Sequence, residues 1–111
     1  MNPVTQEMLN AAICVMVNAV QPEQIILFGS HARGEEQADS DVDLLVIESE
    51  PFGPSRSRFH EIATLERAIG TIPLATDILV YSVSEVEQLK QSANHIVAHA
   101  LREGRVLHAR S

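Results

Sequence analysis

Two apolar runs joined by a short polar connection constrain the fold of this chain more than any other feature. They lie in the sequence IILFGSHARGEEQADSDVDLLVI, residues 25–47, and each run is typical of a buried strand. Gly29 and Ser30 follow the first run, while Asp41 and Asp43 precede the second. Side chains two positions apart on a strand point to the same side, so the two aspartates should project together.

This pattern indicates a site for a metal-bound nucleoside triphosphate. Hard divalent cations such as Mg²⁺ take oxygen ligands, usually one or two carboxylates completed by water and substrate phosphates. Gly29 and Ser30, where a strand ends and a helix begins, offer backbone N–H groups and a hydroxyl to those phosphates. Two alternatives stay open on these residues alone: Asp41 and Asp43 as solvated residues of an exposed strand end, and Ser30 as a helix N-cap.

The positions of the acids also predict the strand directions. Gly29 ends the first strand and Asp41 begins the second, so they share a sheet edge only if these strands are antiparallel. A third apolar run, 77–81, begins with its own acid, Asp77. For Asp77 to reach the same edge, this strand must be parallel to the second, which requires a crossover of a dozen or more residues. Otherwise Asp77 is a capping or turn residue after the Pro73 loop.

Capping signals and periodicity predict the helices. A first helix is expected over residues 3–19, with Asn2 as N-cap and an apolar face formed by Val4, Met8, Ala11, Ala12, Val15 and Ala19. The crossover helix ends at Gly70, and its apolar face is formed by Phe59, Ile62, Ala63, Glu66 and Ile69. Short elements complete the chain: a helix at 30–33 closed by Gly34, a helix to about residue 91 with a Ser84–Glu87 capping box, a helix at 94–103 and an edge strand at 105–108. The expected fold is α/β, one domain over residues 1–111 with a small mixed sheet flanked by helices.

The motifs LFGSHARG and SDVDLLV closely resemble the signature of the DNA polymerase β-like nucleotidyltransferase superfamily, in which ten residues separate Gly29-Ser30 from Asp41-Val42-Asp43. Within it, the chain is most similar to the minimal nucleotidyltransferase (MNT) family, whose members are often the antitoxin half of MNT/HEPN toxin–antitoxin pairs. The likeness covers nearly the whole chain. One departure is His31, where such proteins often carry arginine; a phosphate contact at that position would be weaker and dependent on pH.

The resemblance implies a polymerase β-like fold and an enzyme that moves a nucleoside monophosphate to an acceptor hydroxyl with release of pyrophosphate. ATP is the expected donor. Two Mg²⁺ ions are expected on Asp41, Asp43 and Asp77, and Asp77 should also help to deprotonate the acceptor.

Nucleotide binding is expected at Gly29, Ser30 and Arg33. Arg33 has an equal alternative, which is a surface ion pair with Glu35 or Glu36. The resemblance implies a HEPN toxin as partner in a hetero-oligomer, with AMP placed on a toxin tyrosine. The rival hypothesis is a binding module that neutralises its partner by complex formation without catalysis.

Composition limits the remaining possibilities. The net charge of −7 argues against direct nucleic-acid binding, which depends on clustered Lys and Arg. An acidic site still suits an anionic substrate when cations lie between them. No apolar run approaches the roughly 20 residues that span a bilayer, so no membrane association and a cytoplasmic location are expected. Cys14 is predicted to be a packed thiol, and Arg56 and Arg58 to be solvated.

Overall fold

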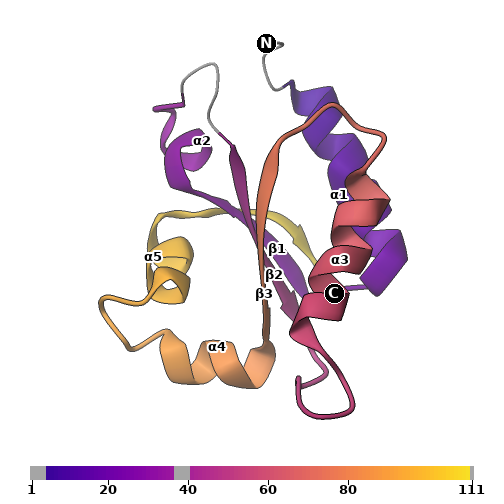
Figure 1. Cartoon of the computed structure of the whole chain (residues 1–111). Coiled ribbons are helices and arrows are strands. Elements are labelled where there is room, and N and C mark those ends of the chain that lie inside the picture. Colours follow the sequence, from indigo (N-terminus) through magenta and orange to yellow (C-terminus); the bar gives the residue numbers. More distant parts are fainter. Residues whose placement is uncertain (1–4, 37–40, 111) are drawn as a thin grey trace.

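The computed structural model describes residues 5–36 and 41–110, which form a four-stranded mixed sheet with helices on both faces (Figure 1). The strands are β1 (Gln24–Phe28), β2 (Val42–Glu48), β3 (Thr76–Ser82) and β4 (Arg105–Ala109). The helices are α1 (Gln6–Val20), α2 (Gly29–Arg33), α3 (Arg58–Ile69), α4 (Val83–Leu89) and α5 (Ile96–Glu103). No helix in these described ranges has the length and apolar composition needed to cross a membrane.

The sheet has the order β3-β2-β1-β4 and the strand directions that the acids predict. β1 is antiparallel to β2, and β2 is parallel to β3, with α3 as the crossover between them. The predicted edge strand is confirmed as β4, which pairs antiparallel with β1. The ends of β1, β2 and β3 that carry Gly29, Asp43 and Asp77 therefore lie at one edge of the sheet.

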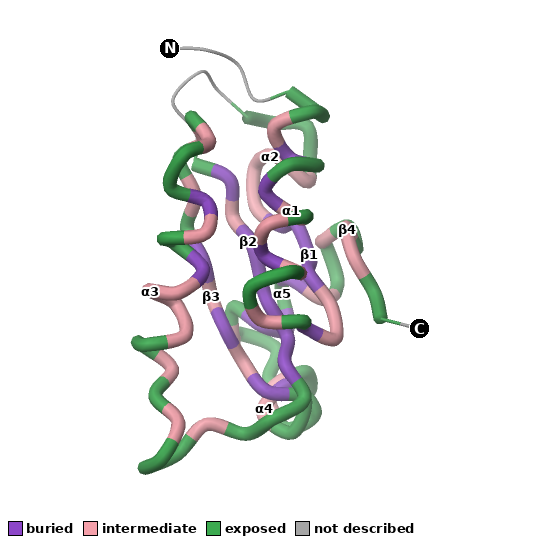
Figure 2. Tube along the Cα trace, turned by 90° about the vertical axis from the view of Figure 1, so that its right-hand side faces the viewer, coloured by how far each residue is buried: buried purple, intermediate pink, exposed green. Residues whose placement is uncertain are grey.

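Alternation along the strands divides the core into two layers. α1 and α3 cover one face, while α2, α4 and α5 lie on the other (Figure 1). Figure 2 shows buried residues running along the central strands between these layers. Val42 and Leu44 point to the face under α1 and α3, whereas Leu45 and Ile47 point to the face under α4 and α5. Asp43 therefore lies on the second face, on the same side as Leu45.

The first helix differs from its prediction. The proposed cap Asn2 lies outside the described residues, and within them the helix begins at Gln6, where the Thr5 hydroxyl accepts a hydrogen bond from the Met8 N–H. The buried positions are Leu9, Ala12 and Met16. Ala12 and Val15 of the predicted face are therefore confirmed as packed, whereas Ala11 and Ala19 are exposed, and Cys14 is exposed rather than packed.

The third and fourth helices carry two further corrections. Ile62 and Ile69 of the predicted face of α3 pack against the core together with Leu65, whereas Phe59 is 82% exposed. The capping box is formed by Ser82 and Glu85, not by Ser84 and Glu87, because β3 continues to Ser82 and α4 starts directly after it. The C-terminal end of α3 at Gly70 is confirmed.

The predicted solvation of Arg56 is wrong, because it organises an acidic cluster at the far end of β2. Its guanidinium bonds to Glu48, to Glu50 at 2.8 Å and to Glu61 at 3.1 Å, and it stacks on Phe52. Glu48 is 3% exposed, and within the described residues its Oε2 atom has no hydrogen-bond partner. A proton on Glu48 turns that oxygen into a donor toward Glu61.

The second loop arginine, Arg58, is also bound rather than solvated. It donates to the Val80 carbonyl at 2.6 Å, forms an ion pair with Glu85, and lies over the rings of Phe52 and Tyr81. The hydrogen bond and the opposite charges within the Arg58–Glu85 pair raise the pKa of Arg58 and lower the pKa of Glu85. The start of α3 is thereby attached to β3 and to the start of α4.

Replacing Glu48 by glutamine is expected to flatten the dependence of stability on pH. Burial, followed by the hydrogen bond and charge of Glu61, raises the pKa of Glu48 to about 8 from 4.5. A folded pKa above the unfolded one stabilises the fold fully below pH 4.5, and this stabilisation is lost as pH rises through about 8. Melting temperatures from pH 5 to pH 9 should therefore fall more steeply in the wild type than in Glu48→Gln.

Glu50→Gln is the matched control, because Glu50 shares the partner Arg56 but has a 73% exposed side chain. The melting temperature of Glu50→Gln should therefore depend on pH in the same way as that of the wild type. Parallel pH profiles for Glu48→Gln and the wild type would contradict the protonated state of Glu48.

Candidate functional site

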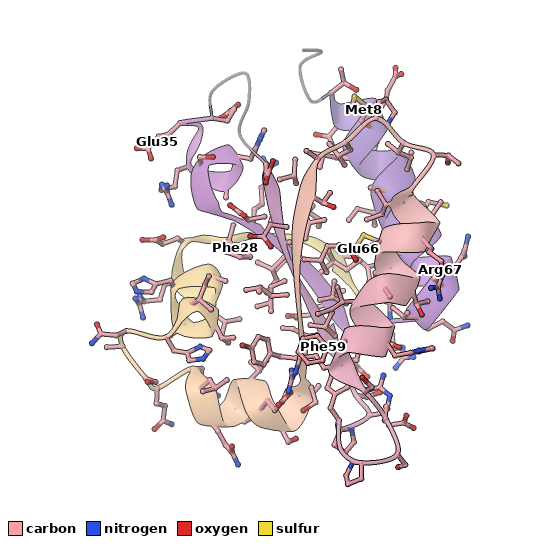
Figure 3. The ribbon with its side chains drawn as sticks, viewed as in Figure 1. Met8, Phe28, Glu35, Phe59, Glu66 and Arg67 are labelled. Carbon is pink, nitrogen blue, oxygen red and sulfur yellow. The ribbon has the colours of Figure 1, made fainter. Side chains whose placement is uncertain are left out.

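Three strand ends bring the candidate residues to one edge of the sheet. Asp43 lies opposite Phe28, the last residue of β1, and opposite Asp77 on β3. Because paired residues on neighbouring strands point to the same face, the Asp43 and Asp77 side chains are neighbours. Figure 3 shows the end of β1 at Phe28 leading into α2, with Glu35 beyond that helix. The edge therefore combines two carboxylates with the start of α2.

Gly29 is required at the start of α2 for two physical reasons. Its φ of +73° lies in the left-handed region, which disfavours other residues. A Cβ atom at this position would lie 2.1 Å from Oδ2 of Asp43. The absence of a side chain thus lets the Asp43 carboxylate lie directly against the turn between β1 and α2.

Ser30 is the second residue of α2, so the alternative that it caps this helix is wrong. The N-cap position is occupied by Phe28, and no side chain caps the helix there. The helix closes at Gly34, whose N–H bonds to the Ser30 carbonyl. The predicted short helix and its glycine end are confirmed.

The electrostatics of the edge centre on Asp43. Burial raises its pKa, and the negative charges of Asp77 and Asp41 raise it further, while His31 and Arg33 act in the opposite direction. Both other aspartates are therefore close enough to act on the Asp43 carboxyl. A group held in a site that disfavours its own negative charge is a candidate for function, because a bound cation would relieve the repulsion.

The three aspartates differ in exposure. Asp43 is half-buried, whereas Asp41, just before β2, and Asp77, near the start of β3, are exposed. In the described part of the chain, no group of three or more His, Cys, Asp or Glu side chains is arranged to hold a metal ion by itself. The carboxylate donors nevertheless suit Mg²⁺, which usually takes one or two carboxylates and fills its other positions with water and substrate phosphates.

Arg33 lies at the end of α2, where it forms an ion pair rather than standing unpaired. Its Nε atom is 2.7 Å from Glu35, and one terminal nitrogen is 3.7 Å from Glu103 on α5. Its side chain is 44% exposed. The surface pairing with Glu35, one of the two predicted alternatives, is thus present in this structure.

A separate hollow of about 360 Å³ lies near the opposite end of β1 and β2. It is lined by strand-end residues and by α4, among them Gln24, Ile47, Val83 and Val86. None of the three aspartates lines it. We assign the candidate site to the aspartate edge, because charged groups of suitable chemistry converge there.

Comparison with known proteins agrees with this geometry. The family described as "Polymerase beta, Nucleotidyltransferase" matches residues 10–111. A protein of Methanocaldococcus jannaschii, provisionally named a protein adenylyltransferase, is 36% identical over 66 residues. The match covers 59% of this chain and 66% of that protein.

Two solved structures show the same fold. A provisionally named nucleotidyltransferase from Sulfolobus solfataricus superposes with a TM-score of 0.64 at 17% identity, covering 94% of this chain and 79% of that chain. The second is a complex of the tri-AMPylated HEPN toxin of Shewanella oneidensis with an MNT antitoxin. It matches with a TM-score of 0.54 at 16% identity, covering 95% of this chain and 72% of that chain.

Proposed function

Since the chain belongs to the polymerase beta nucleotidyltransferase family, we propose that it transfers AMP from ATP to a hydroxyl group of a protein. The observation that carries this proposal is the contact of the Asp43 carboxylate with Gly29, beside Asp77 on the neighbouring strand. This contact joins a carboxylate pair to the turn that opens α2. Metal-bound phosphates need both kinds of group.

In the proposed reaction, the acceptor oxygen bonds to the α-phosphorus of ATP. The bond from that phosphorus to the oxygen bridging to the β-phosphate breaks, and pyrophosphate leaves. Asp77 takes the proton of the acceptor hydroxyl, a role that its exposed position at the edge favours. Asp43, which is half-buried, would face the nucleotide rather than the acceptor hydroxyl.

Two Mg²⁺ ions would be held by Asp41, Asp43 and Asp77, and they would neutralise charge on the α-phosphate and on the leaving pyrophosphate. The raised pKa of Asp43 supports this assignment, because its causes after burial are the charges of the other two aspartates. Cations bound between the three carboxylates would replace their mutual repulsion by attraction to the metal ions. The net charge of −7 is then compatible with an anionic substrate.

Gly29 and Ser30 would bind the distal phosphates through backbone N–H groups and the Ser30 hydroxyl. Arg33 would reach a phosphate by leaving Glu35. An exposed ion pair of this type contributes only about 0–1 kcal/mol, so a phosphate competes with it readily.

The proposed acceptor is a tyrosine of a HEPN toxin, which makes the chain an antitoxin acting in the cytoplasm, where ATP is available. Two findings support it: the provisional name of the archaeal relative and the AMPylated toxin in the Shewanella complex. The rival is neutralisation by complex formation alone. The two hypotheses differ in whether AMP is transferred.

The test is incubation of the chain with ATP labelled at the α-phosphate, Mg²⁺ and a purified HEPN partner. We expect label on a partner tyrosine, and a loss of labelling in Asp77→Asn with complex formation intact. Chelation of Mg²⁺ should have the same effect as the substitution. A wild type that binds and silences the partner without labelling it would replace this proposal by the binding-module hypothesis.

A further inference from the structure

The outer edge of β3 is open in the described part of the chain. Among the strands of residues 5–36 and 41–110, β3 is terminal and pairs only with β2. The Ala75 carbonyl accepts from Val42 on β2, whereas the Val80 carbonyl points the other way and accepts from Arg58. Because backbone groups alternate along a strand, the N–H and C=O groups of Thr76 and Ile78 also face outward.

Arg58 limits the open stretch of β3 at one end, and the candidate catalytic residue Asp77 lies toward the other end. Arg58 occupies the Val80 carbonyl at 2.6 Å and so limits the free edge to the first half of β3. Asp77 lies in that half, between the two residues whose backbone groups face outward. A strand added here would run directly past the acid that faces the acceptor in the proposed reaction.

We infer that an extended, hydroxyl-bearing segment of the acceptor protein adds to β3 as a fifth strand; this inference rests on the proposed function. In antiparallel pairing, Asp77 and the residue opposite form a pair without mutual hydrogen bonds, with Cα atoms about 4.5 Å apart. Their side chains point to the same face. A hydroxyl-bearing residue at that position is thereby held beside Asp77, at the edge where Asp43 lies.

The surroundings of the edge define the chemistry of the occupant. Asp41, Asp43 and Asp77 gather at one end, and the chain has a net charge of −7, so basic flanks are favoured. Phe59, which follows Arg58 in α3, is 82% exposed, and Leu79 on β3 is half-buried. The segment should therefore combine apolar residues, one central hydroxyl and basic ends.

Amide hydrogen exchange measures strand addition without requiring catalysis. The probe is the blocked peptide Lys-Val-Ala-Tyr-Ala-Val-Lys, whose central tyrosine carries its one side-chain hydroxyl. Its addition should slow exchange of the Ile78 N–H at least about tenfold, because that group gains a partner. The Leu79 N–H, which already faces β2, should not change.

Thr76→Pro removes one outward N–H at the first residue of β3, a position that proline tolerates on an edge strand. It should weaken peptide binding about fivefold to tenfold, the effect of one hydrogen bond, while Mg²⁺–ATP binding stays unchanged. Thr76→Val keeps the N–H and should bind the peptide as the wild type does. Equal binding by all three proteins would overturn the inference.

The outcomes separate this inference from the proposed function. AMP transfer to the peptide without protection of Ile78 would overturn the added strand and leave the transferase standing. Protection of Ile78 without AMP transfer, in the wild type as in Asp43→Asn, would support the added strand and count against the transferase. Protection that rises with protein concentration in the absence of peptide would overturn the inference in favour of pairing between two copies of this chain.

Discussion

Replacing Asp43 by asparagine is expected to lower AMP transfer at least about a thousandfold, since stabilisation by a metal ion contributes several kcal/mol to the transition state. Asp43 lies at the centre of the aspartate edge. It is opposite Asp77 on the neighbouring strand, its carboxylate lies against Gly29, and its pKa is raised above the usual 3.8. The measurement is the initial rate of label transfer at saturating ATP. A rate within tenfold of the wild type would contradict the assignment of Asp43 as a metal ligand.

The same substitution should raise the melting temperature of the metal-free protein near pH 7. The folded pKa of Asp43 lies above its usual 3.8, mainly because burial disfavours the charge. The stabilisation from this group is present below pH 3.8 and is lost as pH rises through the folded pKa, so an uncharged asparagine avoids the loss. Asp41→Asn, which removes an exposed carboxylate nearby, should raise the melting temperature less. Mg²⁺ with ATP should stabilise the wild type more than Asp43→Asn.

Replacing Gly29 by alanine is expected to abolish nucleotide binding and to destabilise the fold by more than a positive φ alone explains. The added Cβ would lie 2.1 Å from Oδ2 of Asp43, so the carboxylate or the start of α2 must move. Left-handed backbone costs a non-glycine residue about 1–2 kcal/mol. Displacement of Asp43 from the edge adds to that cost and removes a proposed ligand.

Gly34→Ala is the matched control. Gly34 has a φ of +71°, close to that of Gly29, and a Cβ there meets nothing within 4 Å. Chemical denaturation should show a loss of about 1–2 kcal/mol for Gly34→Ala and a larger loss for Gly29→Ala. Calorimetry should show Mg²⁺–ATP binding retained in Gly34→Ala alone. Equal behaviour of the two variants would mean that the contact of Gly29 with Asp43 has no role.

The topology could be predicted from the sequence because three acids had to reach one edge. That requirement makes β1 antiparallel to β2 and β2 parallel to β3. The length of the crossover between β2 and β3 agrees with the parallel pairing. The placement of Gly29 between a strand and a helix follows from the apolar run before it. These inferences depend on local spacing, which a sequence displays directly.

Features that depend on distant residues were predicted incorrectly. Both Ser82–Glu85 and Ser84–Glu87 match a capping box, and only the length of β3 decides between them. Arg56 is bound because Glu48 and Glu61 approach it from separate elements, which spacing does not reveal. Similarly, nothing in the sequence distinguishes Asp43 from Asp41, although the sheet covers Asp43 by about half and leaves Asp41 exposed.

The most direct test of the site is paramagnetic broadening by Mn²⁺ in place of Mg²⁺, recorded on amide resonances with a non-hydrolysable ATP analogue present. Mn²⁺ takes the same oxygen ligands. We expect the resonances of Ser30, Asp43 and Ile78 to broaden first, while Gln24 and Ile47 at the far strand ends stay sharp. Broadening centred on Glu48 and Glu61, or no selective broadening at any acid, would contradict the proposed metal-bound nucleotide at the aspartate edge.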